Sequence, residues 1–244
     1  MLLACKSDNL YMLNNESVNK KSTMTTNPAR IANPDDLVFY VKYHIKPECI
    51  EEFQEHLFVL VDNMTKEPAF VSAFVHQDTE DPTRFSMYER WQEASKEDFM
   101  TYQMASKDYR RIYEQRLPQM SATPRKIRVL HPMAFWASRQ FETVANDLTF
   151  YTNFQVKSDR QADWKVAAMK IFDKMVKDDG FICAFLHQDA EDPTRFTLYE
   201  RWSQSSQEGF IDEHRKLYEN ILLHAVQTLR NFRVLQPRGN WADE

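Results

Sequence analysis

The stretch that decides the fold occurs twice: residues 76–91 read HQDTEDPTRFSMYERW and residues 187–202 read HQDAEDPTRFTLYERW. Thirteen of the sixteen positions are identical, and the two stretches lie 111 residues apart. Weaker matches continue on both sides, but the closing segments 128–132 and 233–237 are only 105 residues apart. The second copy has therefore lost six residues between Phe210 and Tyr218. Two copies of a unit of roughly 100 residues predict two similar domains in tandem.

Hydrophobic periodicity predicts the same order of elements in both copies. In the first copy we expect strands at 37–45, 69–76, 84–91 and 125–131, and helical regions at 48–66 and 93–119, the second broken near Ser106. In the second copy the strands are 148–156, 181–187, 194–202 and 231–236, and the helical regions 159–178 and 204–229. This βαββαβ order is that of a ferredoxin-like domain.

Helices on one face of such a sheet leave its other face bare. The predicted fold class is therefore α+β, with two ferredoxin-like domains packed as an intrachain dimeric α/β barrel. The predicted organisation is a disordered N-terminal arm at 1–34, domain 1 at 35–132, a linker at 133–146, domain 2 at 147–237 and a tail at 238–244. We expect a monomer with pseudo-twofold symmetry or a homodimer.

Composition limits the classes of partner. The net charge is −5 and no basic stripe is present, so we expect no nucleic acid partner. No apolar run approaches the roughly 18 residues that span a bilayer, so we expect no membrane partner. The three cysteines, Cys5, Cys49 and Cys183, lack metal-ligand spacing, which favours a reduced cytoplasmic location and no metal. Three glycines in all exclude a glycine-rich nucleotide loop.

The residues resemble a known family. The acidic hairpin that ends in Asp-Pro-Thr-Arg-Phe, the strand Tyr-Glu-Arg-Trp at 88–91 and 199–202, and the helix that follows resemble the antibiotic biosynthesis monooxygenase (ABM) family. The resemblance covers about 35–132 and 146–237. It implies a dimeric α/β barrel, and its members with known activity include cofactor-free monooxygenases of quinols and phenols, haem-degrading enzymes and an isomerase. For this chain, the quinol-monooxygenase-like members imply a small aromatic substrate, O2 and no cofactor.

Strand alternation places Phe85, Met87, Glu89 and Trp91 on one face of their strand. If this face lies under the helices, Glu89 is at least partly buried, and its charge needs a partner or its pKa rises. The functional hypothesis is a pocket with Glu89 or Glu200 as base and with aromatic walls: Trp91, Trp202, Phe85 and Phe196. The alternative is a core tryptophan and a glutamate paired with an arginine across the strands.

His76 and His187 end the second strand of each copy. A neutral imidazole can accept a proton from a phenol, so both are candidate bases. Alternatively, each histidine caps the hairpin by bonding to an aspartate such as Asp78 or Asp81. In the same hairpin we expect aspartates to accept backbone N–H groups, and Arg84 and Arg195 to balance the acidic charge.

The second copy also carries a haem-like set of residues. Asn153, Trp202 and His214 are similar in type and order to the triad of the family's haem-degrading branch, in which the histidine binds iron. Haem is therefore the alternative cofactor. The charged neighbours of His214, on the other hand, favour a position on the helix surface. Tyr40 and Tyr151 belong either to the core or to the wall of a pocket for a flat substrate.

Three functions follow from the sequence. The first is a cofactor-independent monooxygenase that oxidises a small electron-rich quinol or phenol with O2. The second is a haem-binding or haem-degrading protein that uses domain 2. The third is a non-catalytic protein that binds a small ligand, which a dry pocket without any titratable group would favour.

Overall fold

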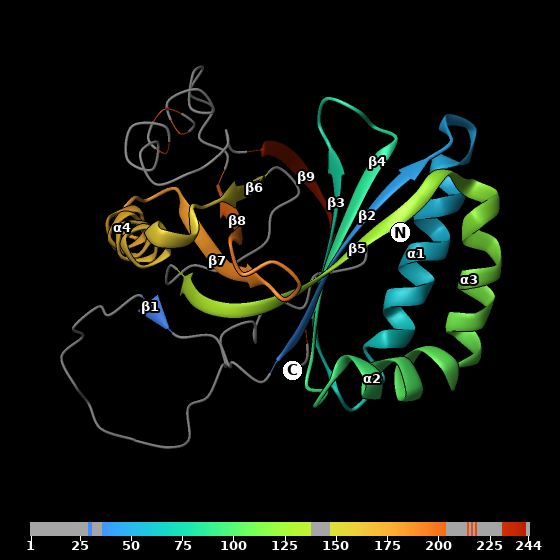
Figure 1. Ribbon diagram of the computed structural model, residues 1–244. Helices are drawn as coiled ribbons and strands as arrows, with labels where there is room; N and C mark the ends of the chain where they lie inside the picture. The colour runs from blue at the N-terminus through green and yellow to red at the C-terminus, as the bar shows by residue number, and fades with distance from the viewer. Residues whose placement is uncertain are drawn as a thin grey trace, which may run out of the picture. The chain divides into compact units, whose positions relative to one another are not determined.

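The computed structural model describes residues 29–30, 36–137, 147–203, 214, 216, 218 and 231–242 (Figure 1). These residues fall into two compact units. Unit 1 contains residues 36–131 and 234–242, and unit 2 contains the others. Each unit is described by itself below.

Unit 1 has the predicted βαββαβ order. Its elements are β2 (Leu37–Ile45), η1 (Pro47–Cys49), α1 (Ile50–Met64), β3 (Phe70–Asp78), β4 (Arg84–Trp91), α2 (Lys96–Asp98), the π-helix η2 (Phe99–Ala105), α3 (Asp108–Met120) and β5 (Ser121–Ala137). The predicted break near Ser106 is confirmed, because η2 and α3 are separate helices on either side of it. In Figure 1, α1 and α3 run beside the strands of this unit.

Unit 2 repeats the order as far as the structure describes it. Its elements are β6 (Leu148–Gln155), η3 (Ser158–Arg160), α4 (Gln161–Met175), β7 (Phe181–Asp189), β8 (Arg195–Trp202) and the start of β9 (Asn231–Ala242). The predicted second helical region, 204–229, lies outside the described residues except for His214, Lys216 and Tyr218, which are helical. A short strand, β1 (Ala29–Arg30), pairs with Phe135 and Trp136 of β5.

Strand pairing gives the connectivity of the predicted fold class. The hydrogen-bonded order is β1-β5-β2-β4-β3-β9-β6-β8-β7, with an additional β5–β7 pairing. The orders β5-β2-β4-β3 and β9-β6-β8-β7 are each that of a ferredoxin-like sheet. The strands are longer than predicted, since β5 continues through 133–137 and β9 through 238–242, where a linker and a tail were expected. Pro132 and Pro237 do not end the strands, since a proline is tolerated where no ladder N–H is needed.

The core of unit 1 lies between its sheet and its helices. Phe85, Met87 and Trp91 of β4 pack in one hydrophobic cluster with Phe53 and Leu57 of α1. The helix contributes because its apolar residues recur every three or four positions, and the strand contributes every second residue. The predicted division of β4 into two faces is therefore confirmed, and the face that carries Glu89 lies under the helices.

Candidate functional site

A buried carboxylate lies at the centre of the helix-covered face in unit 1. Glu89 is 4% exposed and Trp91 is fully buried. The indole Nε1 of Trp91 donates a hydrogen bond of 3.0 Å to Oε2 of Glu89. The rings of Phe70 and Phe99 lie 5.4 and 5.3 Å from the Trp91 ring, in edge-on contact. Both hypotheses from the sequence required this burial: the pocket with Glu89 as base, and the core tryptophan with a paired glutamate.

The charges of two arginines act on Glu89: Arg110 of helix α3 and, more weakly, Arg125 of strand β5. Arg110 of α3 is 4% exposed, and its guanidinium carbon lies 5.2 Å from the ring centres of both Trp91 and Phe99. Burial raises the pKa of Glu89 above its ordinary value of 4.5, although the charge of Arg110 and the Trp91 hydrogen bond lower it in part. The Glu89 carboxyl is thus shifted toward its neutral form.

Gln103 is another buried polar side chain of unit 1. It lies on the π-helix η2, is 5% exposed, and donates from Nε2 to Oε1 of Glu93 at 2.7 Å. The start of this helical region is fixed by Ser95, whose hydroxyl accepts a hydrogen bond from the backbone N–H of Asp98 at 3.0 Å. Unit 1 thus buries an amide, a guanidinium and a carboxyl.

Unit 2 places a different set around the matching carboxylate. Glu200 is completely buried, and Trp202 donates from Nε1 to its Oε2 at 3.1 Å. Nε2 of His214 lies 3.0 Å from the same oxygen. The other carboxylate oxygen, Oε1, is buried and has no hydrogen-bond partner among the described residues. The site therefore joins an imidazole to a carboxylate that keeps one oxygen available as an acceptor.

The expected surface position of His214 is wrong. His214 is 5% exposed, and its ring stacks on Phe150 at 4.6 Å and meets the rings of Trp202 and Tyr218 edge-on at 5.0 and 5.2 Å. His214 and Tyr218 are four residues apart, so they share one helix face, while Lys216 between them is exposed. The charge of Lys216 therefore does not indicate the side of the helix on which His214 lies.

His76 and His187 lie on the opposite sheet face from the glutamates. His76 pairs in register with Ser86, whereas Glu89 pairs with Ala73. Tyr40 pairs with Tyr88 and so shares the face of His76. His187 and Tyr151 have the equivalent places in unit 2, opposite Thr197 and Tyr199. Both histidines are 1% exposed, but neither shares a face with Trp91 or Trp202, so the hypothesis of a histidine base against a tryptophan wall is wrong.

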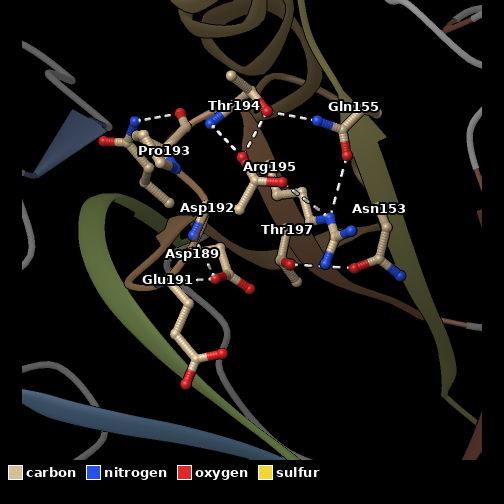
Figure 2. Close-up of polar contacts among 10 residues, drawn as sticks. Asn153, Gln155, Asp189, Glu191, Asp192, Pro193, Thr194, Arg195 and Thr197 are labelled. Atoms are coloured by element: carbon tan, nitrogen blue, oxygen red, sulfur yellow. Dashed lines mark hydrogen bonds and ion pairs between the residues drawn. The ribbon is translucent and has the colours of Figure 1, made fainter.

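The haem-like set is not brought together. Asn153 pairs with Thr197 across the sheet, on the face away from Trp202 and His214, because alternate residues of β6 point to opposite faces. Its Oδ1 accepts a hydrogen bond from the Thr197 hydroxyl at 3.1 Å (Figure 2). The residues present therefore do not fit the haem site that the resemblance implied. Phe196 does lie on the helix-covered face, 4.4 Å from the Trp164 ring.

The acidic hairpin acts as a structural turn in both units. Figure 2 shows it in unit 2, where Oδ1 of Asp189 accepts the backbone N–H groups of Glu191 and Asp192 at 2.9 and 3.0 Å. Asp192 in turn accepts from Thr194 and pairs with Arg195 at 3.2 Å. Hydrogen bonds from Thr194 lower the pKa of Asp192. The predictions of aspartate-capped turns and of a charge-balancing arginine are confirmed.

Sequence reasoning missed a buried ion pair in each unit. Arg90 pairs with Asp36, and Arg201 pairs with Asp147 at 2.9 Å. All four side chains are at least nine-tenths buried. The two aspartates are 111 residues apart, just before the first strand of each copy, so extending the repeat comparison by one residue would have found them. Arg110 has a signal of the same kind, because RRIYE at 110–114 matches RKLYE at 215–219, 105 residues further on.

Comparison with known proteins identifies the family. The family model for antibiotic biosynthesis monooxygenase matches residues 37–115 and 148–217. The chain belongs to this family. The two matches cover the strands and helices that hold Glu89 and Glu200 in the two units. No curated protein matches the chain.

Solved structures share the fold of this ABM protein. A "putative monooxygenase" from Fusobacterium nucleatum subsp. nucleatum is 13% identical with a TM-score of 0.71, covering 85% of this chain and 94% of its own. A protein of the same description from Lactobacillus acidophilus is 14% identical (TM-score 0.67, coverage 85% and 96%). An "anthrone oxidase-like protein" is 16% identical (TM-score 0.65, coverage 88% and 96%). At such identities the likeness concerns the fold alone.

Two features are absent from the described part of the ABM protein. None of its described helices is long and apolar enough to cross a membrane. No group of three or more metal-ligating side chains occurs among the same residues. The cytoplasmic location and the oligomeric state stay predictions.

Proposed function

We propose that this ABM protein is a cofactor-independent monooxygenase that uses unit 2 to oxidise a small, electron-rich phenol or quinol with O2. The observation that carries the proposal is the buried Glu200 carboxylate, with Trp202 and His214 on one oxygen and no hydrogen-bond partner on the other among the described residues. The pair places a proton acceptor and a second titratable group together, which is the arrangement that general base catalysis uses.

The proposed first step is removal of a proton from the substrate hydroxyl. The hydroxyl donates to Oε1 of Glu200, and the proton is held by the Glu200–His214 pair, whose nearest atoms are 3.0 Å apart. Water is excluded there, since Glu200 is completely buried and His214 nearly so. In such a dry site the phenolate is poorly solvated, which favours transfer of an electron to O2.

The remaining steps balance without an added cofactor. The substrate radical and superoxide combine into a peroxide at a ring carbon that carries hydrogen, so a C–O bond forms. The O–O bond then breaks: one oxygen stays as a carbonyl, and the other leaves as water with the hydrogen of that carbon and the proton that the Glu200–His214 pair returns. A phenol and O2 thus give a quinone and water, with the four electrons supplied by the substrate.

Aromatic side chains in unit 2 suit a flat substrate. His214 stacks on Phe150, and Trp202 lies edge-on to both His214 and Phe181. A planar ring that enters beside Glu200 can make the same offset or edge-on contacts, which are worth about 0.5–1.5 kcal/mol each beyond their buried area. We therefore propose Trp202 and Phe150 as the walls of the substrate site.

Oxygen uptake tests the proposal. We expect uptake with 1,5-dihydroxynaphthalene, with metals chelated, above the autoxidation blank, and formation of 5-hydroxy-1,4-naphthoquinone. With ¹⁸O2, one labelled oxygen should enter the quinone. His214→Ala and Glu200→Gln should each lower the rate by about a hundredfold or more, because a positioned base contributes that much to proton transfer.

Lys216→Ala is the matched control, because Lys216 is on the same helix turn but exposed. It should keep the parent rate. The proposal is wrong if no reduced quinol or dihydroxynaphthalene is consumed above the blank. It is also wrong if the Glu200 and His214 variants are as active as the parent chain.

A further inference from the structure

Unit 1 contains buried hydrogen-bonding atoms that no described residue satisfies. Nε and Nη2 of Arg110 and Oε1 of Gln103 are shielded from solvent and lack a hydrogen-bond partner in the described part of the chain. A buried polar atom left in this state costs about 1–3 kcal/mol, and more when the group is charged. We propose that the two Arg110 donors form a second ligand site in unit 1, which binds a small aromatic carboxylate.

The charge of the cluster selects an anion. Arg110 carries a positive charge at every relevant pH and is 4% exposed. The nearby Glu89 carboxyl is shifted toward its neutral form by burial. No described carboxylate forms an ion pair with the Arg110 guanidinium, and a ligand carboxylate would supply one. Two adjacent N–H donors of a guanidinium match the two oxygens of a carboxylate.

The walls of the cluster select an aromatic ligand. The guanidinium carbon of Arg110 lies 5.2 Å from the ring centres of Trp91 and Phe99 and 5.8 Å from that of Tyr109. A ring attached to the bound carboxylate would lie among these side chains.

The helical region around this site is longer in unit 1 than in unit 2. Nine residues separate Gln103 from Tyr113, whereas three separate His214 from Tyr218. The six additional residues, 104–109, include the end of the π-helix Phe99–Ala105 and Tyr109, whose ring lies beside Arg110. Single π-helical turns are frequent at functional sites. On η2, Phe99 and Gln103 are buried, whereas Met100 and Tyr102 are 49% and 58% exposed.

Calorimetric titration of the full chain tests the proposal, with 2-naphthoate and the neutral 2-naphthalenemethanol as probes. We expect saturable binding of 2-naphthoate at one site, with at least about tenfold weaker binding of the alcohol, because the alcohol cannot form charge-assisted hydrogen bonds with Arg110 through a carboxylate. Arg110→Met, which keeps the length of the side chain, should weaken naphthoate binding by about tenfold or more. His214→Ala should leave the affinity of this site unchanged.

Three results would overturn the proposal. The first is no binding of 2-naphthoate to the parent chain. The second is equal affinity for the two probes, which requires no variant and so stands even if Arg110→Met fails to fold. The third is naphthoate binding that survives Arg110→Met but disappears in His214→Ala, which would place the ligand in unit 2.

Discussion

The two units use the same strand to build two different sites. Glu89 and Glu200 both accept a hydrogen bond from the tryptophan two residues later, at 3.0 and 3.1 Å. The helical residues beside them differ among the described residues, because Arg110 lies over the Trp91 ring in unit 1 and His214 lies against Glu200 in unit 2. The strand thus supplies the same hydrogen-bonded glutamate and tryptophan in both units, and the residues of the covering helices differ. A duplicated chain can change one site while the other keeps its own function.

The largest expected effect is on the free energy of unfolding and concerns the buried Asp–Arg ion pair that both units contain. Asp147→Ala leaves Arg201 buried without its carboxylate, which should cost roughly 3–5 kcal/mol in free energy of unfolding. Asp36→Ala should cost a similar amount through Arg90. Urea unfolding followed by tryptophan fluorescence measures both.

The double variant Asp147→Leu with Arg201→Met is the control, because an apolar pair removes both charges and should restore most of the stability. A small effect of either single variant would mean that the pair contributes little. A large difference between Asp36→Ala and Asp147→Ala would show that the two ion pairs do not contribute equally to the stability of the two units.

A smaller effect separates the two carboxylates. Trp91→Phe removes the indole donor to Glu89, and Trp202→Phe removes the donor to Glu200. Glu200 keeps His214 at 3.0 Å from the same oxygen. Trp91→Phe should therefore be more destabilising, by at most about 1 kcal/mol, because the His214 contact is close but is not a well-aligned hydrogen bond. Both substitutions shorten the ring system equally, so equal destabilisation in urea unfolding would mean that His214 does not hold the Glu200 oxygen.

The smallest effect is a change in pH dependence. Burial raises the pKa of Glu89 above its ordinary 4.5, so above that pH the unfolded chain binds fewer protons at this group than the folded chain. This contribution therefore destabilises the fold as the pH rises from about 4.5 through the raised pKa. Glu89→Gln cannot ionise and should flatten that decline in the free energy of unfolding.

Glu51→Gln, at an exposed position of α1, gives the effect of losing one charge at the surface. If Glu89→Gln and Glu51→Gln have the same profile between pH 4 and pH 8, Glu89 titrates normally in the folded chain. That result would also remove the charge argument for an anion beside Arg110.

The fold of each unit could be predicted from the sequence because it depends on patterns within short segments. The repeat gave the domain number, and alternation in the strand Phe85–Trp91 identified the face that the helices cover. The site was predicted only in part. Glu89, Glu200, Trp91 and Trp202 lie where expected, but His76 and Asn153 point away from them. The sheet face on which each of these residues lies depends on the register between strands, which the pattern within one strand does not determine.

The sequence by itself determined the two ferredoxin-like units, the order of their elements and the acidic turns, because periodicity and turn chemistry are local properties of the chain. Only the tertiary structure decided that His214 is buried against Glu200 and that Arg110 stacks on Trp91. These contacts join residues of a helix and a strand that are 14 and 19 positions apart. Whether such side chains meet depends on how the helix packs on the sheet, which spacing along the chain does not fix.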